Sequence, residues 1–144
     1  MEALVARASV VIAASRAVVW GVLMSPETIP LIMPVTAVIA PWQPGQRFVW
    51  AFKLGPRESR VEGVVHRVED ERLLEYEYQD PHSRDVLGIQ NAHRVTLELF
   101  DDGDGTRLDV VQDANVSKAA QAHAEGGWRL ALNNLKGLVE QSRS

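Results

Sequence analysis

A long stretch of alternating apolar and polar residues, from about residue 35 to residue 113, constrains the fold of this chain most strongly. A period of two places successive side chains on opposite faces of a β-strand. Turn signals interrupt the stretch at short intervals, among them Pro44-Gly45, Gly55-Pro56 and Gly103-Asp104-Gly105. Because these connections are too short for crossover helices, we predict an antiparallel meander. Together with a first strand over residues 8–14, it gives about seven strands.

The two faces of the predicted sheet differ in character. One face collects apolar and aromatic side chains: Phe48, Trp50, Phe52, Val61, Val65, Leu74, Tyr76, Tyr78, Val95, Leu97, Leu99, Leu108 and Val110. The opposite face carries mixed charges, for example Arg60, Glu75 and Arg94. A sheet that is apolar on one face needs a second layer to cover that face.

The C-terminal segment, residues 116–142, is predicted to be this cover. Its apolar residues recur at helical spacing: Trp128, Leu132, Leu135 and Val139. Since Gly126-Gly127 directly precedes this stripe, we expect the well-ordered part of the helix to begin near Trp128.

Two short helices are predicted between the first strand and the meander. Ser15 stands at an N-cap position before the first of them, and Ser25-Pro26-Glu27 has the pattern that begins the second. The order of elements predicts an α+β fold in which a curved sheet wraps around the long C-terminal helix. We expect one domain over residues 1–144, because a chain of this length forms a single core.

A set of short segments, spread in order over almost the whole chain, carries a family resemblance. The segments are Val19-Trp20 with Leu23, Pro44-Gly45, Gly63-x-Val65 followed by Tyr76, Val95-Thr96-x-Glu98-Leu99, Gly105-Thr106-Arg107-Leu108, and Gly127-Trp128 with Leu132, Leu135 and Lys136. As an ordered set they resemble the START-like (SRPBCC) superfamily with the helix-grip fold. Within it, the chain is similar to the branch of the activator of heat-shock protein 90 ATPase and its bacterial homologues.

This resemblance implies a deep cavity between the sheet and the long helix. Two positions of that region depart from the family pattern. Met33-Pro34 stands where many relatives have tryptophan before proline, and Gln112 stands where many have a histidine. The resemblance does not imply one chemistry, because members range from ligand carriers to cyclases and chaperone co-factors.

The inward-facing residues are the candidates for a ligand site. The predicted site consists of Phe48, Trp50, Phe52, Val61, Val65, Tyr76, Tyr78, His93, Leu97, Gln112 and Trp128. Its aromatic rings would crowd a closed core, but they could line a cavity for a flat or apolar ligand. The alternative is that they simply fill the core. Gln112 needs a partner if it is buried, or else it lies at a strand end and reaches solvent.

His93 lies two positions before Val95, so its side chain is predicted to face inward as well. It is the best candidate for a general acid or base. The alternative is a structural histidine bonded to a backbone carbonyl. Of the other histidines, His66 is expected to face water, His82 lies in a loose loop and His123 precedes the glycine pair. No short spacing joins these histidines, so we expect no metal site and no cofactor.

Composition excludes several classes of protein. The chain has no cysteine, and its net charge of −4 includes no basic block of the kind that binds nucleic acid. No apolar run reaches the ~18 residues that a membrane span needs. The apolar N-terminal stretch alternates and carries Arg7 and Arg16, so we do not expect a signal peptide. We expect a cytoplasmic protein.

From these features we expect the binding of a hydrophobic or aromatic small molecule that is lipid- or polyketide-like. One alternative is a cyclase- or dehydratase-type enzyme, in which His93 and a tyrosine exchange protons with the substrate. Another, less favoured, is a co-factor module that binds a chaperone ATPase, as the family branch implies. The exposed edge strands of the predicted sheet are also compatible with a homodimer.

Overall fold

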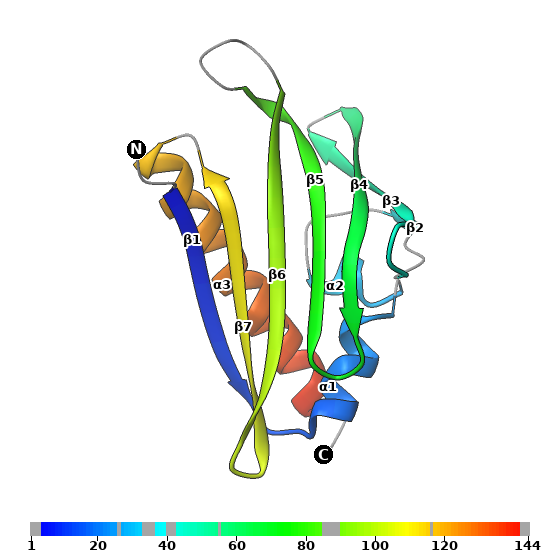
Figure 1. Ribbon diagram of the computed structural model, residues 1–144, viewed down its shortest axis with the longest axis vertical. Helices are drawn as coiled ribbons and strands as arrows, with labels where there is room; N and C mark the ends of the chain where they lie inside the picture. The colour runs from blue at the N-terminus through cyan, green and yellow to red at the C-terminus, as the bar shows by residue number, and fades with distance from the viewer. Residues whose placement is uncertain are drawn as a thin grey trace.

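An antiparallel seven-stranded sheet with the strand order β1-β7-β6-β5-β4-β3-β2 dominates the fold (Figure 1). The computed structural model describes residues 4–25, 27–32, 37–39, 43–54, 56–84, 90–115 and 117–141. The strands are β1 (Leu4–Ile12), β2 (Ala37–Ile39), β3 (Arg47–Leu54), β4 (Arg57–Glu69), β5 (Leu73–Arg84), β6 (Gln90–Asp102) and β7 (Gly105–Asn115). The meander from β2 to β7 and the pairing of β1 with β7 agree with the predicted number of strands.

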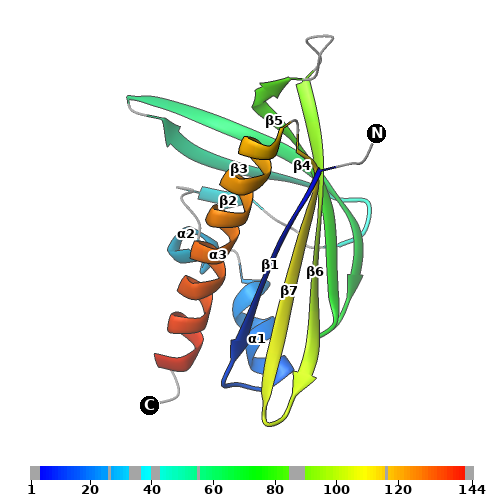
Figure 2. The same ribbon diagram turned by 90° about the vertical axis from the view of Figure 1, so that its left-hand side faces the viewer.

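The helices lie on one side of this sheet. They are α1 (Arg16–Leu23), α2 (Ile29–Ile32) and α3 (Lys118–Gln141). Figure 2 shows that the sheet curves and that α3 runs along its concave side, with α1 and α2 on the same side. The predicted α+β helix-grip architecture is therefore confirmed. No helix in the described ranges is both long and apolar enough to cross a membrane.

The boundaries of two elements differ from the sequence prediction. β1 begins at Leu4 rather than at residue 8, because its first residues pair with the end of β7. α3 begins at Lys118 and runs through the glycine pair. Contacts with β1 hold these first turns: Gln121 Nε2 donates to the carbonyl oxygen of Val5 at 2.8 Å. In addition, the Arg7 N–H donates to Glu125 Oε2 at 3.0 Å.

The short helices follow local capping signals. Ser15 has extended backbone angles, and its hydroxyl accepts from the Val18 N–H at 3.3 Å, as an N-cap does. α2 begins at Ile29, and the predicted start at Pro26 lies outside the described residues. Before it, Thr28 Oγ1 donates to the carbonyl oxygen of Ser25 at 2.9 Å.

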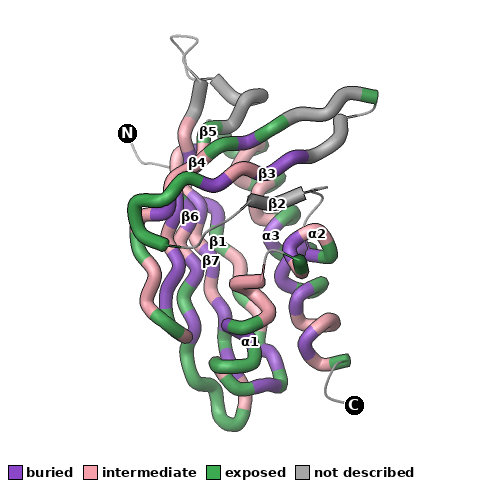
Figure 3. The backbone as a smooth tube through the Cα atoms, turned by 90° about the vertical axis from the view of Figure 1, so that its right-hand side faces the viewer, coloured by how far each residue is buried: buried purple, intermediate pink, exposed green. Residues whose placement is uncertain are grey.

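The core fills the space between the concave face of the sheet and the helices (Figure 3). Among the residues predicted to face inward whose side chains are described, all are buried apart from Tyr78, which is partly exposed. For Phe52, only the backbone is among the described parts of the chain. From the helix, Trp128, Leu132 and Leu135 pack against this face.

A β-bulge interrupts the period of two in β4. Val65 pairs with Tyr76, and the next pair is Arg67 with Glu75, so His66 is the extra residue. Val65 and Val68 consequently both pack against the core. His66 lies beside Glu77 with its Nε2 4.0 Å from the carboxylate; its side chain is partly exposed, as expected for the water-facing side, but its Nε2 is covered.

Glu140 joins the end of α3 to the end of β1. Its Oε2 accepts from the Ala13 N–H at 2.9 Å and from Lys136 Nζ at 2.7 Å. Lys136 Nζ also donates to the carbonyl oxygen of Val11 at 2.7 Å. The hydrogen bond from Lys136, and then that from Ala13, lower the pKa of Glu140 below its ordinary value.

Replacing this carboxylate, as Glu140→Gln, is expected to flatten the acid limb of the stability profile. In the wild-type protein the unfolded chain takes up this proton first as the pH falls, starting near pH 4.5. The contribution of Glu140 is therefore complete above that pH and declines below it, until the folded state is protonated as well. Urea unfolding between pH 7 and pH 3 measures the effect, with Glu98→Gln as the control for loss of an exposed carboxylate. Parallel profiles for wild type and Glu140→Gln would contradict it.

Candidate functional site

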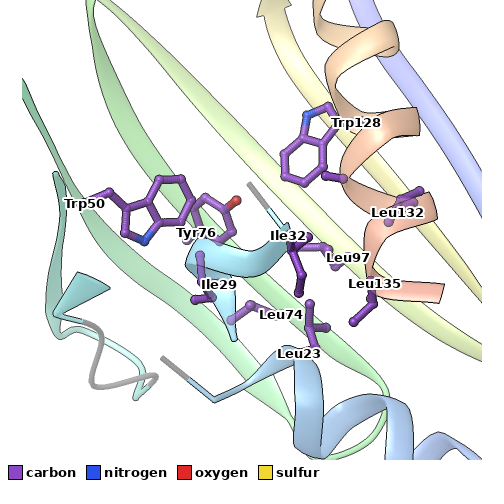
Figure 4. A pocket seen from close by; sticks show the side chains of 11 residues that line it. Leu23, Ile29, Ile32, Trp50, Leu74, Tyr76, Leu97, Trp128, Leu132 and Leu135 are labelled. Atoms are coloured by element: carbon purple, nitrogen blue, oxygen red, sulfur yellow. The ribbon is translucent and has the colours of Figure 1, made fainter. Parts of the chain in front are cut away.

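A cavity of about 40 Å³ lies between α3 and the concave face of the sheet (Figure 4). Side chains from α1, α2, β3, β5, β6 and α3 line it: Leu23, Ile29, Ile32, Trp50, Leu74, Tyr76, Leu97, Trp128, Ala131, Leu132 and Leu135. No charged side chain is among these lining residues. The only polar groups that they carry are the two indole N–H groups and the hydroxyl of Tyr76.

The residues predicted as a ligand site separate into three groups in the structure. Those that line the cavity are Trp50, Tyr76, Leu97 and Trp128. Those buried in the core outside the lining are Phe48, Val61 and Val65. Those in a neighbouring polar cluster are Tyr78, His93 and Gln112. The side chain of Phe52 lies outside the described residues.

The short helices contribute lining residues that the sequence analysis did not include. Leu23 is the last residue of α1, and Ile29 and Ile32 lie three positions apart in α2. Asn134 of α3 donates from Nδ2 to the carbonyl oxygen of Ile32 at 3.0 Å and so ties α2 to the long helix. The spacing of the two isoleucines is the only sequence signal, and a four-residue helix is too short for a reliable periodicity.

Aromatic rings form the sheet side of the cavity. Trp50 and Tyr76 meet edge to face, with ring centroids 5.5 Å apart and planes at 75°. Phe48 packs against both, at 5.1 Å from Trp50 and 5.2 Å from Tyr76. Such tilted and T-shaped arrangements are the favoured ones for aromatic pairs. The rings therefore fix one another in place.

The phenol of Tyr76 is neutral in this setting. Burial, and secondarily the neighbouring Tyr78, raise the pKa of Tyr76 well above its ordinary value. A phenol of this kind offers a hydroxyl for hydrogen bonding but does not serve as a phenolate base near neutral pH.

Gln112 is the centre of the polar cluster and is buried, with 6% of its surface exposed. Its Oε1 accepts from Trp128 Nε1 at 2.8 Å and from the Tyr78 hydroxyl at 3.3 Å. Asn115 Nδ2 donates to the carbonyl oxygen of Gln112 at 3.0 Å and to that of Leu4 at 2.8 Å. Of the two alternatives for Gln112, the structure shows the buried residue with partners. The cluster holds the indole of Trp128 against the cavity.

His93 is also buried and is bonded to the backbone. Its Nδ1 lies 2.8 Å from the carbonyl oxygen of Asp113, which only accepts, so Nδ1 carries the proton. The ring centroid is 5.3 Å from that of Tyr78. This geometry matches the structural alternative for His93, and His93 does not line the cavity.

A second, broader depression lies on the outer face of β1 and β7. Its charged groups already pair with one another: Asp109 Oδ1 accepts from Ser9 Oγ at 2.6 Å and from Arg107 Nε at 3.2 Å. The cavity under α3 is therefore the better candidate site. Within the described ranges, no three His, Asp or Glu residues come together in a way that could hold a metal ion.

Sequence and structural comparisons agree with this architecture. The family model for activator of Hsp90 ATPase homolog 1-like protein, AHSA1, matches residues 13–140. The chain belongs to the AHSA1 family. This family lies in the SRPBCC, or START-like, helix-grip superfamily, as the resemblance implied. No curated protein sequence matches the chain significantly.

Solved structures share the AHSA1-like fold over nearly the whole chain. Protein MLL2253 from Mesorhizobium loti has a TM-score of 0.80 at 20% identity, covering 95% of this chain and 97% of that one. ChR145 from Cytophaga hutchinsonii has a TM-score of 0.79 at 27% identity, covering 99% and 98%. DynU16, a protein of the dynemicin biosynthetic locus, has a TM-score of 0.79 at 19% identity, covering 96% of this chain and 48% of that one.

Proposed function

We propose that this AHSA1-family protein binds a small hydrophobic or aromatic molecule in the cavity between α3 and the sheet. The observation that carries the proposal is an unfilled apolar space, walled by Trp50, Tyr76 and Trp128, inside an otherwise packed core. Protein interiors are normally close-packed, and apolar cavities take up apolar guests. The chain shares its fold with DynU16, a protein of the dynemicin biosynthetic locus, and this is compatible with a small-molecule ligand.

The size of the cavity limits how such a ligand enters. Typical ligand pockets hold about 300–1,000 Å³. This cavity holds about 40 Å³, so lining side chains must move apart on binding. We expect α2 to be the part of the lining that moves, because it is a single helical turn; Asn134 Nδ2 ties it to α3 by a hydrogen bond to the carbonyl oxygen of Ile32. A one-ring aromatic compound is therefore the sensible first ligand to test.

Ala131→Leu is expected to block this binding. Ala131 is 5% exposed and lines the cavity, so a leucine side chain at this position occupies the space that the ligand needs. We expect the affinity for acetophenone to fall about tenfold or more, which corresponds to about 1.4 kcal/mol. Two-dimensional NMR titration of labelled protein measures the dissociation constant. Thermal unfolding should show unchanged or higher stability, because the substitution fills a void.

Ala122→Leu is the matched control, since Ala122 is exposed on the same helix. It should leave the affinity for acetophenone as in the wild type. If Ala131→Leu binds the compound as tightly as the wild-type protein does, the ligand does not occupy this cavity and the proposed function is wrong.

A further inference from the structure

One buried donor in the cavity wall lacks a partner. Trp50 is 6% exposed, and its Nε1 has no hydrogen-bond acceptor within the described ranges. The other indole of the wall, that of Trp128, donates to Gln112 Oε1 at 2.8 Å. A buried N–H without an acceptor is destabilising, and native proteins rarely leave one in place.

The two indoles are turned differently toward the cavity (Figure 4). The nitrogen of Trp128 points away from the other lining side chains, so its six-membered ring faces them. The nitrogen of Trp50 lies on the ring edge turned toward Ile29, which also lines the cavity. The Nε1 atom of Trp50 is covered in this structure, so an acceptor reaches its N–H only when lining side chains move apart, whereas the N–H of Trp128 is already bonded to Gln112.

The ring of Trp50 is held in this orientation by its neighbours. Phe48 and Tyr76 pack against it with centroids 5.1 and 5.5 Å away, and Tyr78 lies at 6.2 Å. The donor is thus fixed in advance, which lowers the entropic cost of binding an acceptor. A water molecule is a poor alternative partner, because it needs two to four polar groups and this lining provides few.

We propose that the N–H of Trp50 recognises a hydrogen-bond acceptor on an uncharged aromatic ligand, a carbonyl or ether oxygen. This inference rests on the proposed function and names the chemical class of ligand for the same cavity. The ligand is uncharged because none of the described residues that line the cavity is cationic or anionic, and an ion buried without a counter-ion is strongly disfavoured. A pure hydrocarbon would leave the donor unpaired. Aromatic ketones and quinone-like compounds satisfy both conditions.

A matched pair of compounds tests the inference. Acetophenone and α-methylstyrene have nearly the same shape, but only acetophenone carries an oxygen acceptor. In the Trp50→Phe variant, which keeps an aromatic ring and removes the N–H, we expect the affinity for acetophenone to fall about fivefold more than that for α-methylstyrene. Because any effect of the smaller ring acts on both compounds, the ratio of the two dissociation constants isolates the hydrogen bond.

Trp20→Phe is the control, since Trp20 is a buried tryptophan of α1 that does not line the cavity. It should leave the ratio unchanged. A second measurement uses the wild-type protein and so does not depend on how the variant folds. Acetophenone should move the Trp50 indole ¹H–¹⁵N resonance downfield, and α-methylstyrene should move it much less.

The outcomes separate this inference from the proposed function. If both compounds bind, the ratio is the same in wild type and Trp50→Phe, and the indole resonance responds equally to both, the acceptor is not recognised by Trp50 and only this inference is wrong. If neither compound binds the wild-type protein, the proposed function is wrong and the inference with it.

Discussion

Gly63→Ala is expected to lower the free energy of unfolding by about 3 kcal/mol or more, the upper range for overpacking a core. Gly63 pairs with Phe48 on one side and with Tyr78 on the other, in the centre of the sheet. A Cβ atom at this position would collide with the carbonyl oxygen of Glu77 and with the ring of Phe48. Because the first of these is backbone of the neighbouring strand, the clash cannot be relieved by a rotamer change.

Urea unfolding measures this loss, and Gly126→Ala is its matched control. A Cβ atom at Gly126 meets no atom within 4 Å, and the residue lies inside α3. The same substitution there should raise the free energy of unfolding by about 0.5–1 kcal/mol, because alanine favours the helix. Equal effects at the two positions would show that Phe48 does not pack over Gly63 as described.

Gln112→Leu is expected to cost about 3 kcal/mol, because it leaves the buried indole N–H of Trp128 without its acceptor. The substitution keeps a side chain of similar size but removes the oxygen that binds this indole and the hydroxyl of Tyr78. The indole of Trp128 should also lose its fixed orientation at the cavity wall. We therefore expect weaker acetophenone binding together with the loss of stability.

A double-mutant cycle with Trp128→Phe separates the hydrogen bond from the other effects. Once the indole N–H is absent, Gln112→Leu has one buried donor fewer to leave unpaired. The double variant should therefore be more stable than the sum of the single effects predicts, by about 1 kcal/mol. Strict additivity in thermal or urea unfolding would rule out the Gln112–Trp128 bond as a stabilising contact.

Much of the fold was predictable from local patterns in the sequence. Alternation in segments such as Leu74-x-Tyr76 identifies the inner face of a strand, and the stripe from Trp128 to Val139 identifies the helix that covers it. These patterns repeat a single physical rule, which is that apolar side chains must share a face to be buried together. The bulge at His66 is not visible in this way, because it depends on how β4 pairs with β5.

The candidate site was predictable only in part. The alternation along the strands predicted that Trp50, Tyr76 and Leu97 lie on the inner face, and they do line the cavity. The same alternation also selected Phe48 and Val65, which are packed in the core outside the cavity lining. Alternation states which side of the sheet a residue occupies, but it does not state how far along the strand the space beneath α3 lies.

The kinds of element, their inner faces and the family can be inferred from the sequence, because period, capping and turn chemistry are local properties. Which indole has a partner follows only from the folded arrangement. Trp128 and Gln112 are bonded across the gap between α3 and β7, while Trp50 packs among aromatic rings and has no acceptor among the residues that the structure describes. Hydrogen bonds between side chains from distant elements depend on the curvature of the sheet and the position of the helix over it. The pattern of one strand or one helix does not contain these quantities.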